Sequence, residues 1–591
     1  MSAARRSPAI RPAVPRPAAP PAAGSPSGLY ARPWRVLAVV LLIAGISCLL
    51  GLGAAPLLDW DENMQSEVAR QALLSGDLLQ LTLNGQPFTE KPPLFFLEMA
   101  AFFKLFGVSE TTARMTTAVN GLLFLAALFW IARVLVETEL AALWSLLFAS
   151  AFLPLLLSRA AVVEHTFNAL MALGALTLVA YDETYSQWRE TARAAGGRRS
   201  RWRHWAWLVA AAAALGLAVL AKGPSGGAVP LVAFAGYKLV RRGAPPHPGH
   251  WLACGVLSLA VALSWYAANY VAHGGAFVRE FARFMGLLFA RPLEGHSGPF
   301  YYHWAVALVG LFPWTPLLLL YALPEVRRSI GTDPRSRALA AMGLVWAGFI
   351  LVVFSLVKTK LPHYSSGMYV PLTLLAALAL MHAVRLRERP PGWICALMAA
   401  YGLAMAALFA ILPYRMAALA EAAGAALDPP PGIPRLAFLP GVVLGTGTCL
   451  GAWLLFRGRA FLGVALTAAG MGAFMIGAWR VHLPLVAAYN QGPMLALVEE
   501  AYGAGGDLAL YENVSYAALF YGRREIEMVG TYKFAGDPAR LDAPGERPLY
   551  VIAPKESRER LRTEHPRLTH VRDLGALSLY RLAAKGESGV R

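Results

Sequence analysis

Residues 59–93 read DWDENMQSEVARQALLSGDLLQLTLNGQPFTEKPP and lie between hydrophobic parts of the chain. Three acidic residues, Asp59, Asp61 and Glu62, follow the first apolar segment directly. An adjacent acid and base, Glu90 and Lys91, come later in the stretch and precede two prolines. Charged groups are costly to hold beside hydrocarbon, so charges at the mouth of a membrane protein usually belong to a functional site. This stretch is therefore the leading candidate for the chemistry of the chain.

The composition is that of a membrane protein. Apolar residues make up 57% of the chain and charged residues only 15%, whereas about a quarter of the residues of a soluble protein are charged. The net charge is +18, but the arginines lie in short loops between apolar segments, where they set the orientation of the protein. We therefore expect the bilayer as a partner and no nucleic acid.

Apolar runs of bilayer length recur up to about residue 482 and predict a multi-spanning α-helical protein with about 13 transmembrane helices. The expected spans are 36–58, 113–135, 139–157, 163–181, 205–221, 226–240, 249–272, 303–322, 337–357, 365–384, 392–412, 436–456 and 460–482. Because the number of spans is odd and the arginine-rich loops are expected in the cytoplasm, the N-terminus should lie on the cytoplasmic side and the C-terminal part on the opposite side. The run 94–108 is short and contains Glu98 and Lys104. We expect it to form a helix at the membrane interface.

Three domains are predicted. Residues 1–35, rich in Pro, Ala and Arg, form a disordered cytoplasmic tail. Residues 36–482 form the transmembrane domain, with a first outer loop at 59–112. Residues 483–591 form a small α/β domain outside the membrane, in which DLALYE, REIEMV, PLYVIAP and ALSLYRL are expected strands and SRERLRTEH a helix. The Arg-, Ala-, Pro- and Gly-rich composition indicates a bacterium with GC-rich DNA, and with it the inner membrane.

Other outer loops bring further polar residues to the same membrane face. These residues are Glu164, His165, Lys222, Arg283, His296, Lys358, Lys360, His363 and Tyr364. Cations on the outer side run against the topological bias, and the phosphate of a polyprenyl phosphate would explain them, because such pairs are strong in a low dielectric. The outer histidines have no tight metal-ligand spacing. A divalent metal stays open, and no other cofactor is expected.

The ordered motifs of the chain resemble those of the GT-C fold glycosyltransferases related to protein O-mannosyltransferases and lipid A aminoarabinose transferases. The similar motifs are Asp61-Glu62, Ser75-Gly76-Asp77, Asn84-Gly85, Glu90-Lys91-Pro92-Pro93, Arg114, Leu220–Pro224, Leu311–Thr315 and Lys360–Tyr364. The similarity covers most of residues 36–380 and fades over the last spans and the soluble part.

The resemblance implies a GT-C fold and an inverting transfer of a sugar from a polyprenyl-phosphate donor to a lipid, glycan or protein acceptor on the periplasmic face. It implies that Asp61 lies beside the anomeric carbon, as a base for a hydroxyl acceptor or as an orienting group for a phosphate acceptor. Glu62 and Glu164 are the other expected catalytic acids. Lys91 would hold the donor phosphate, and Glu90 would fix Lys91 or a neighbouring cation.

The other outer residues complete the expected site. Donor-phosphate binding is predicted for Lys222, Arg283, Lys358 and Lys360 as well as Lys91, and supporting roles for Asp59, Glu90, His165, His296, His363 and Tyr364. Structural explanations also exist. Asp61 and Glu62 suit the start of a helix, Lys222 suits the end of one, and Lys91, Lys358 and Lys360 suit snorkelling to the interface.

Two other functions stay open at this point. A transporter or flippase would bind the same lipid without chemistry, but such proteins usually carry mid-membrane charges and paired repeats, and neither is evident in this sequence. An oligosaccharide ligase would use a pyrophosphate-linked donor. The acid pair together with the Glu90-Lys91-Pro92-Pro93 loop favours an enzyme with a monophosphate-linked donor.

Overall fold

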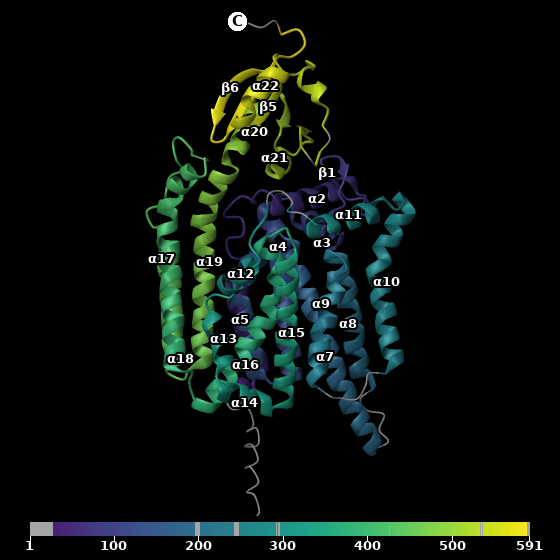
Figure 1. The fold of residues 1–591 in the computed structure, drawn as a ribbon, viewed down its shortest axis with the longest axis vertical. Helices are drawn as coiled ribbons and strands as arrows, with labels where there is room; N and C mark the ends of the chain where they lie inside the picture. Colours follow the sequence, from purple (N-terminus) through teal and green to yellow (C-terminus); the bar gives the residue numbers. More distant parts are fainter. Residues whose placement is uncertain are drawn as a thin grey trace, which may run out of the picture.

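The computed structural model describes residues 28–195, 201–241, 247–290, 292, 296–424, 426–531, 533–534 and 536–587. Most of the expected disordered tail, residues 1–27, lies outside the described residues. Its last part forms the 3-10 turn η1 (Gly28–Ala31) and the start of helix α1 (Pro33–Leu49). A bundle of long helices forms the body of the molecule, and a small domain with a sheet lies over one end of this bundle (Figure 1).

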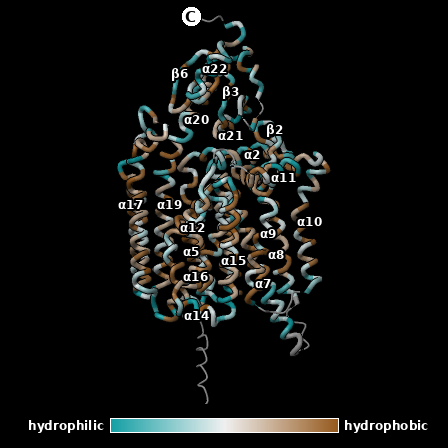
Figure 2. The backbone as a smooth tube through the Cα atoms, viewed as in Figure 1, coloured by the Kyte–Doolittle hydropathy of each residue, from teal (hydrophilic) through white to brown (hydrophobic). Residues whose placement is uncertain are grey.

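Long apolar helices build the bundle, and hydrophobic residues predominate along them (Figure 2). Within the described residues, nine helices are long and apolar enough to cross a membrane. They are α4 (Glu110–Leu135), α7 (Val163–Ala195), α8 (Arg201–Lys222), α10 (Pro248–His273), α15 (Pro334–Leu356), α16 (Tyr369–Arg387) with the preceding turn η3 (Pro362–Met368), α17 (Gly392–Ala422), α18 (Leu439–Phe456) and α19 (Ala460–Asn490). The prediction of a multi-spanning helical protein is confirmed.

Two bent pairs raise the number of candidate spans in the described part to eleven. Helix α5 (Thr138–Ser150) meets α6 (Phe152–Arg159) at 66°, and α12 (Tyr302–Gly310) meets α13 (Thr315–Leu318) and η2 (Leu319–Ala322) at 106°. Pro313 lies in the second break, where its missing N–H prevents a continuous helix. Helices α1 and α9 (Ser225–Val240) are apolar but shorter. A helix or bent pair thus lies at each expected span, and the total of thirteen stays a prediction.

Several short elements lie at the end of the bundle that carries the C-terminal domain (Figure 1). They are α2 (Asp61–Ser75), the hairpin of β1 (Thr82–Leu83) and β2 (Gln86–Pro87), α3 (Leu94–Phe106) and α11 (Ala276–Ala290). Asn84 and Gly85 have positive φ angles of 53° and 70°, as a two-residue hairpin turn requires. Helix α3 has 13 residues, so it is about 20 Å long and too short to cross hydrocarbon about 30 Å thick. The opposite end of the bundle carries α14 (Pro324–Thr332).

The C-terminal domain has a five-stranded mixed sheet in the order β4-β3-β5-β7-β6. Its elements are α20 (Gly492–Gly503), β3 (Asp507–Tyr511), α21 (Tyr516–Gly522), β4 (Glu527–Val529), η4 (Pro538–Leu541), β5 (Leu549–Pro554), η5 (Lys555–Ser557), α22 (Arg558–Glu564), β6 (Thr569–Leu574) and β7 (Leu577–Leu582). The four expected strands and the expected helix are all present, which confirms the α/β domain. Sequence analysis missed β6 because this edge strand is almost entirely exposed and lacks an apolar alternation. Helix α19 continues through the predicted boundary at 483 to Asn490.

Polar contacts attach the C-terminal domain to the first outer loop. Asp59 accepts hydrogen bonds from the Ser515 hydroxyl at 2.8 Å and from the Ala517 N–H at 2.9 Å, at the start of α21. The Asn84 side chain donates to the Ile526 carbonyl and accepts from the Ile526 N–H, at 2.8 and 2.9 Å. Asp59, expected to support the reaction, therefore caps a helix of the neighbouring domain.

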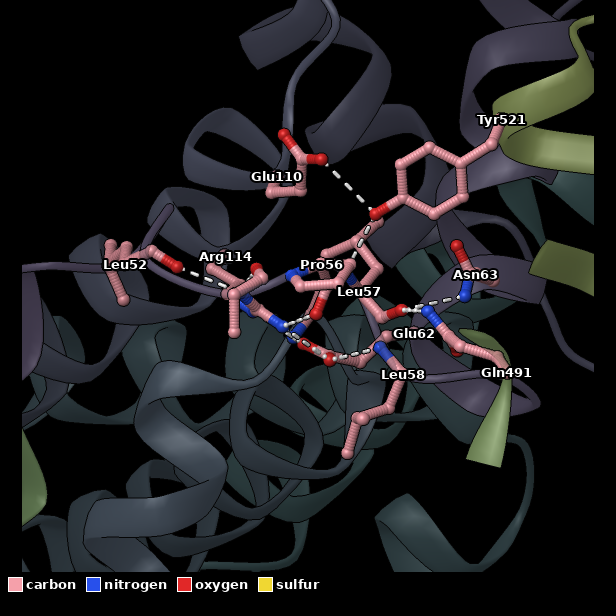
Figure 3. Close-up of polar contacts among 12 residues, drawn as sticks. Leu52, Pro56, Leu57, Leu58, Glu62, Asn63, Glu110, Arg114, Gln491 and Tyr521 are labelled. Carbon is pink, nitrogen blue, oxygen red and sulfur yellow. Dashed lines mark hydrogen bonds and ion pairs between the residues drawn. The ribbon is translucent and has the colours of Figure 1, made fainter. Parts of the chain in front are cut away.

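Tyr521 of α21 makes a third attachment (Figure 3). Its hydroxyl donates to the Glu110 carboxylate at 3.1 Å and accepts from the Leu57 N–H at 2.8 Å. The Leu57 carbonyl accepts from Gln491 at the end of α19 and from Asn63 of α2. These contacts fix the position of the C-terminal domain over one end of the bundle.

Candidate active site

A cavity of about 460 Å³ lies where the bundle, the first outer loop and the C-terminal domain meet. Its charged lining residues are Asp61, Glu90, Lys91, Lys222 and Lys533. Much of the remaining wall is apolar and comes from α9, α11 and α15, with Val229, Phe284, Leu288, Val353 and Phe354 among its residues. The cavity thus combines a charged part with a hydrophobic part, as a site for an amphipathic ligand requires.

Four helix ends bring the charged groups together. Asp61 is the first residue of α2, Glu164 the second residue of α7, Lys222 the last residue of α8, and His363 lies in η3. Lys91 Nζ lies 2.9 Å from Asp61 Oδ1, and Lys222 Nζ lies 2.6 Å from Glu164 Oε1.

The His363 ring links these two ion pairs. Its Nε2 atom lies 3.6 Å from Asp61 Oδ2 and 3.7 Å from Glu164 Oε1. Two carboxylates, two ammonium groups and one imidazole therefore form a continuous cluster. All five of these residues are among those expected at the site from the sequence.

The surroundings of the Asp61–Lys91 pair favour the charged form of both side chains. Burial alone would raise the pKa of Asp61, but the charges of Lys91, His363 and Lys222 outweigh it and hold that pKa below its ordinary value. Burial would lower the pKa of Lys91, but Asp61 and Glu164 outweigh it and raise that pKa. The Asp61 side chain keeps 29% of its surface exposed, so it remains accessible to a substrate from the cavity.

This pair predicts a pH dependence of stability. A carboxyl group whose pKa is lowered by folding stabilises the protein above the pKa of the unfolded chain, about 4, and the stabilisation is lost as the pH falls through the lower pKa of the folded state. The difference in melting temperature between wild type and Asp61→Asn should therefore be constant from about pH 5 upward and shrink below about pH 4. Thermal unfolding in detergent measures it. A difference that already shrinks between about pH 7 and pH 5 would contradict the lowered pKa of Asp61.

Aromatic residues surround the charged cluster. Lys222 Nζ lies 4.9 Å from the centre of the Tyr364 ring, a cation–π distance. His296 lines the cavity, and its ring centre lies 6.4 Å from that of Trp60. Tyr364 and His296 thus lie where sequence analysis expected supporting residues.

Glu90 pairs with a residue that sequence analysis missed. Its Oε1 atom lies 2.6 Å from Nζ of Lys533, which belongs to the C-terminal domain. Glu90 therefore binds a neighbouring cation and not Lys91. Lys533 lies in a loop without a recognisable motif, so only the three-dimensional structure assigns it to the cavity.

Both carboxylate oxygens of Glu62 are engaged in polar contacts within the protein (Figure 3). Glu62 is not part of the cavity lining. Its two carboxylate oxygens lie 2.8 Å from Nε and Nη2 of buried Arg114. The same oxygens accept hydrogen bonds from the Leu58 and Ala161 N–H groups, both at 2.9 Å. Arg114 also donates to the Leu52, Ala55 and Pro56 carbonyls. The expected catalytic role of Glu62 is therefore corrected to a structural role.

Lys360 is also corrected. Its Nζ atom donates to the Phe354 and Ser355 carbonyls at 2.6 and 2.8 Å, at the C-terminal end of α15. Burial and the nearby charge of Lys358 lower the pKa of Lys360. A cation at a helix C-terminus satisfies carbonyls that lack a partner within the helix. Lys360 therefore caps α15 and is not part of the cavity lining.

Arg283, Lys358 and His165 lie away from the charged cluster. The Arg283 side chain is 73% exposed and pairs weakly with Glu280 on the same helix. Lys358 is exposed and, like Arg283, is not part of the cavity lining. His165 is buried against Gly121, so close that a Cβ at Gly121 would lie 2.7 Å from its Nε2 atom. The structure does not bring these three residues to the expected site.

The acidic, histidine and cysteine side chains that the structure describes form no group of three or more with the geometry of a metal site.

Comparisons with known proteins agree with the fold. The family of dolichyl-phosphate-mannose-protein mannosyltransferases matches residues 39–274. An uncharacterized protein of Aquifex aeolicus (strain VF5) is 26% identical over 321 residues, which are 54% of this chain and 58% of that protein. The undecaprenyl phosphate-alpha-4-amino-4-deoxy-L-arabinose arabinosyl transferase of Edwardsiella ictaluri (strain 93-146) is 26% identical over 356 residues, 58% of each chain. The chain thus matches less than two thirds of the length of these relatives.

A solved structure covers much more of the chain. The crystal structure of ArnT from Cupriavidus metallidurans bound to undecaprenyl phosphate aligns with 93% of this chain and 98% of that chain, with a TM-score of 0.73 and 22% identity. The fold is therefore that of a GT-C membrane protein. The solved structure establishes the fold, and the family model matches the part of the chain from residue 39 to residue 274.

Proposed function

We propose that this protein is an inverting glycosyltransferase that moves a sugar from a polyprenyl monophosphate to a lipid, glycan or protein acceptor. The observation that carries the proposal is that the Asp61–Lys91 pair and Lys222, which pairs with buried Glu164, line the charged part of a largely apolar cavity. The apolar wall suits a prenyl chain, the two ammonium groups suit its phosphate, and the exposed carboxylate suits an acceptor. The relatives named for undecaprenyl phosphate substrates support this donor class.

The proposed reaction is a single displacement at the anomeric carbon. An acceptor oxygen attacks this carbon from the face opposite the phosphate, and the carbon–oxygen bond to the phosphate breaks with its electron pair left on the phosphate. The leaving polyprenyl phosphate carries more negative charge than the donor, so Lys91 and Lys222 stabilise it more strongly than the ground state. With a hydroxyl acceptor, Asp61 takes the proton. With a phosphate acceptor no proton has to be removed, and Asp61 orients the acceptor.

The proposal places the cavity and the C-terminal domain on the periplasmic side of a bacterial inner membrane. Arg385 and Arg387 lie in the last turn of α16. Arg457 follows α18 directly. In Figure 1 these helices end at the side of the bundle away from the C-terminal domain. Arginine clusters favour the cytoplasmic side.

Lys91 and Lys222 are expected to contribute to the affinity for the donor phosphate. Removing a charged hydrogen-bonding group costs about 1.5–3 kcal/mol, which is about a 10- to 150-fold change in affinity. Lys91→Ala and Lys222→Ala should each weaken undecaprenyl phosphate binding by this factor. Binding to protein in nanodiscs measures it, with Lys555→Ala, an exposed lysine of the C-terminal domain, as the control. Equal affinities in wild type and all three variants would show that Lys91 and Lys222 do not bind the donor phosphate.

A transfer assay tests the function itself. Purified protein in nanodiscs receives a panel of radiolabelled undecaprenyl phosphate sugars together with a bacterial membrane extract as the acceptor. The proposal predicts that label from at least one donor moves to an acceptor fraction. Binding of the donors without transfer or hydrolysis would contradict it and favour a transporter.

A further inference from the structure

The cavity has a second charged part, separate from the Asp61–Lys91–His363–Glu164–Lys222 cluster. The Glu90–Lys533 ion pair lies here, with side chains only 20% and 14% exposed. Both residues line the cavity, one from the first outer loop and one from the C-terminal domain. Nothing in the proposed displacement uses this pair.

Aromatic rings adjoin the ion pair. Lys533 Nζ lies 4.9 Å from the centre of the Tyr516 ring, and the Tyr516 and Trp60 rings meet edge to face at 5.7 Å. Both aromatic residues line the cavity; Trp60 is 40% exposed and offers its ring to a ligand, whereas Tyr516 is 1% exposed and supports Trp60 and Lys533 from behind. Trp60 also has a φ angle of 75°, which is rare for a large residue. Because Trp60 directly precedes Asp61, the aromatic surface lies next to the carboxylate.

The chemistry of these groups matches a sugar ring. A saccharide has apolar C–H faces that pack on aromatic rings and a rim of hydroxyl groups that hydrogen-bond to charged groups. A carboxylate and an ammonium group at the edge of an aromatic surface can offer such a rim the acceptor and donor positions that their own ion pair leaves unused. Charged hydrogen bonds are stronger than neutral ones. Because both side chains are largely shielded from solvent, their hydrogen bonds to a sugar would be stronger than in water.

We propose that Trp60, Tyr516, Glu90 and Lys533 form a saccharide subsite that the C-terminal domain completes. This inference rests on the proposed function and deepens it. The sugar is either the one transferred from the donor or one that belongs to the acceptor. The attachments at Asp59 and Asn84 hold the C-terminal domain over the first outer loop, so the subsite is preformed.

Two variants test the subsite. Lys533→Met and Trp60→Leu should each weaken sugar recognition at least tenfold, but should change the affinity for sugar-free undecaprenyl phosphate less than twofold. Lys533→Arg keeps the charge and should retain most of the wild-type recognition. Lys555→Met, an exposed lysine of the same domain, is the matched control. A melting curve of each variant verifies that it is folded.

The two sources of the sugar give different results. If the subsite holds the donor sugar, Lys533→Met and Trp60→Leu weaken the binding of undecaprenyl phosphoryl-glucose, -mannose or -4-amino-4-deoxy-arabinose more than the binding of undecaprenyl phosphate. If the subsite holds an acceptor glycan, the two substitutions leave these affinities unchanged and raise the KM for the acceptor. The inference is overturned if neither quantity changes, or if undecaprenyl phosphate binding falls by the same factor, which indicates only a structural contact. Absence of transfer by the wild-type protein would refute the proposed function instead.

Discussion

Asp61→Asn is expected to lose sugar transfer by roughly 10²–10⁴-fold, the usual contribution of a positioned acid or base. Asparagine has nearly the same shape but carries no charge, so it neither takes a proton nor holds Lys91, whose ammonium group lies 2.9 Å from the carboxylate. A steady-state transfer assay with saturating donor measures kcat. Undecaprenyl phosphate binding should persist, because Lys91 and Lys222 remain.

Glu499→Gln is the matched control for this substitution. Glu499 is an exposed acid on α20, away from the cavity lining. Its replacement removes one negative charge without touching the charged cluster, so transfer should stay at the wild-type rate. An Asp61→Asn protein with more than about a tenth of the wild-type kcat would show that Asp61 only orients the acceptor.

Glu62→Gln is expected to damage the fold and not the chemistry. Removing one partner of a buried ion pair leaves the other charge uncompensated and costs about 3–5 kcal/mol. Arg114 is fully buried and depends on Glu62 for its only carboxylate contact among the described residues. The melting temperature and the yield of folded protein should therefore fall strongly. Fluorescence-detected unfolding in detergent measures both effects.

Arg283→Gln is the matched control for Glu62→Gln, because it breaks an ion pair that is exposed to solvent. The Arg283 and Glu280 side chains are 73% and 52% exposed, and exposed pairs contribute little to stability. The melting temperature of this variant should stay close to that of wild type. A Glu62→Gln protein that is as stable as wild type but inactive would contradict the structural role and restore a catalytic role.

The sequence predicted the membrane fold well because apolar length and arginine-rich loops report directly on spans. It also predicted that Asp61, Lys91, Glu164, Lys222 and His363 reach one face, since all of them lie in an expected outer loop or at the end of an expected span. Helix ends then bring these residues into contact, at distances that no spacing along the chain encodes. The sheet was predicted except for β6, whose exposed residues lack the alternation of a half-buried strand.

Asp61 and Glu62 are adjacent in the sequence, but their carboxylates point to different surroundings. Adjacent residues on a helix point about 100° apart, as follows from 3.6 residues per turn. One carboxylate therefore faces the cavity and the other faces Arg114. The sequence does not specify which residue takes which direction, because the answer depends on the position of α4. Lys533 was missed for a similar reason, since its partner Glu90 lies in another domain.

The most direct test of the proposed function is a single-turnover experiment in proteoliposomes. Protein in excess over undecaprenyl phosphate carrying a labelled sugar is mixed with an acceptor, and the free undecaprenyl phosphate and the labelled acceptor are measured together. We predict that one undecaprenyl phosphate is released for each sugar transferred, with inversion at the anomeric carbon. Label that stays on the lipid while the lipid moves between leaflets would contradict the account.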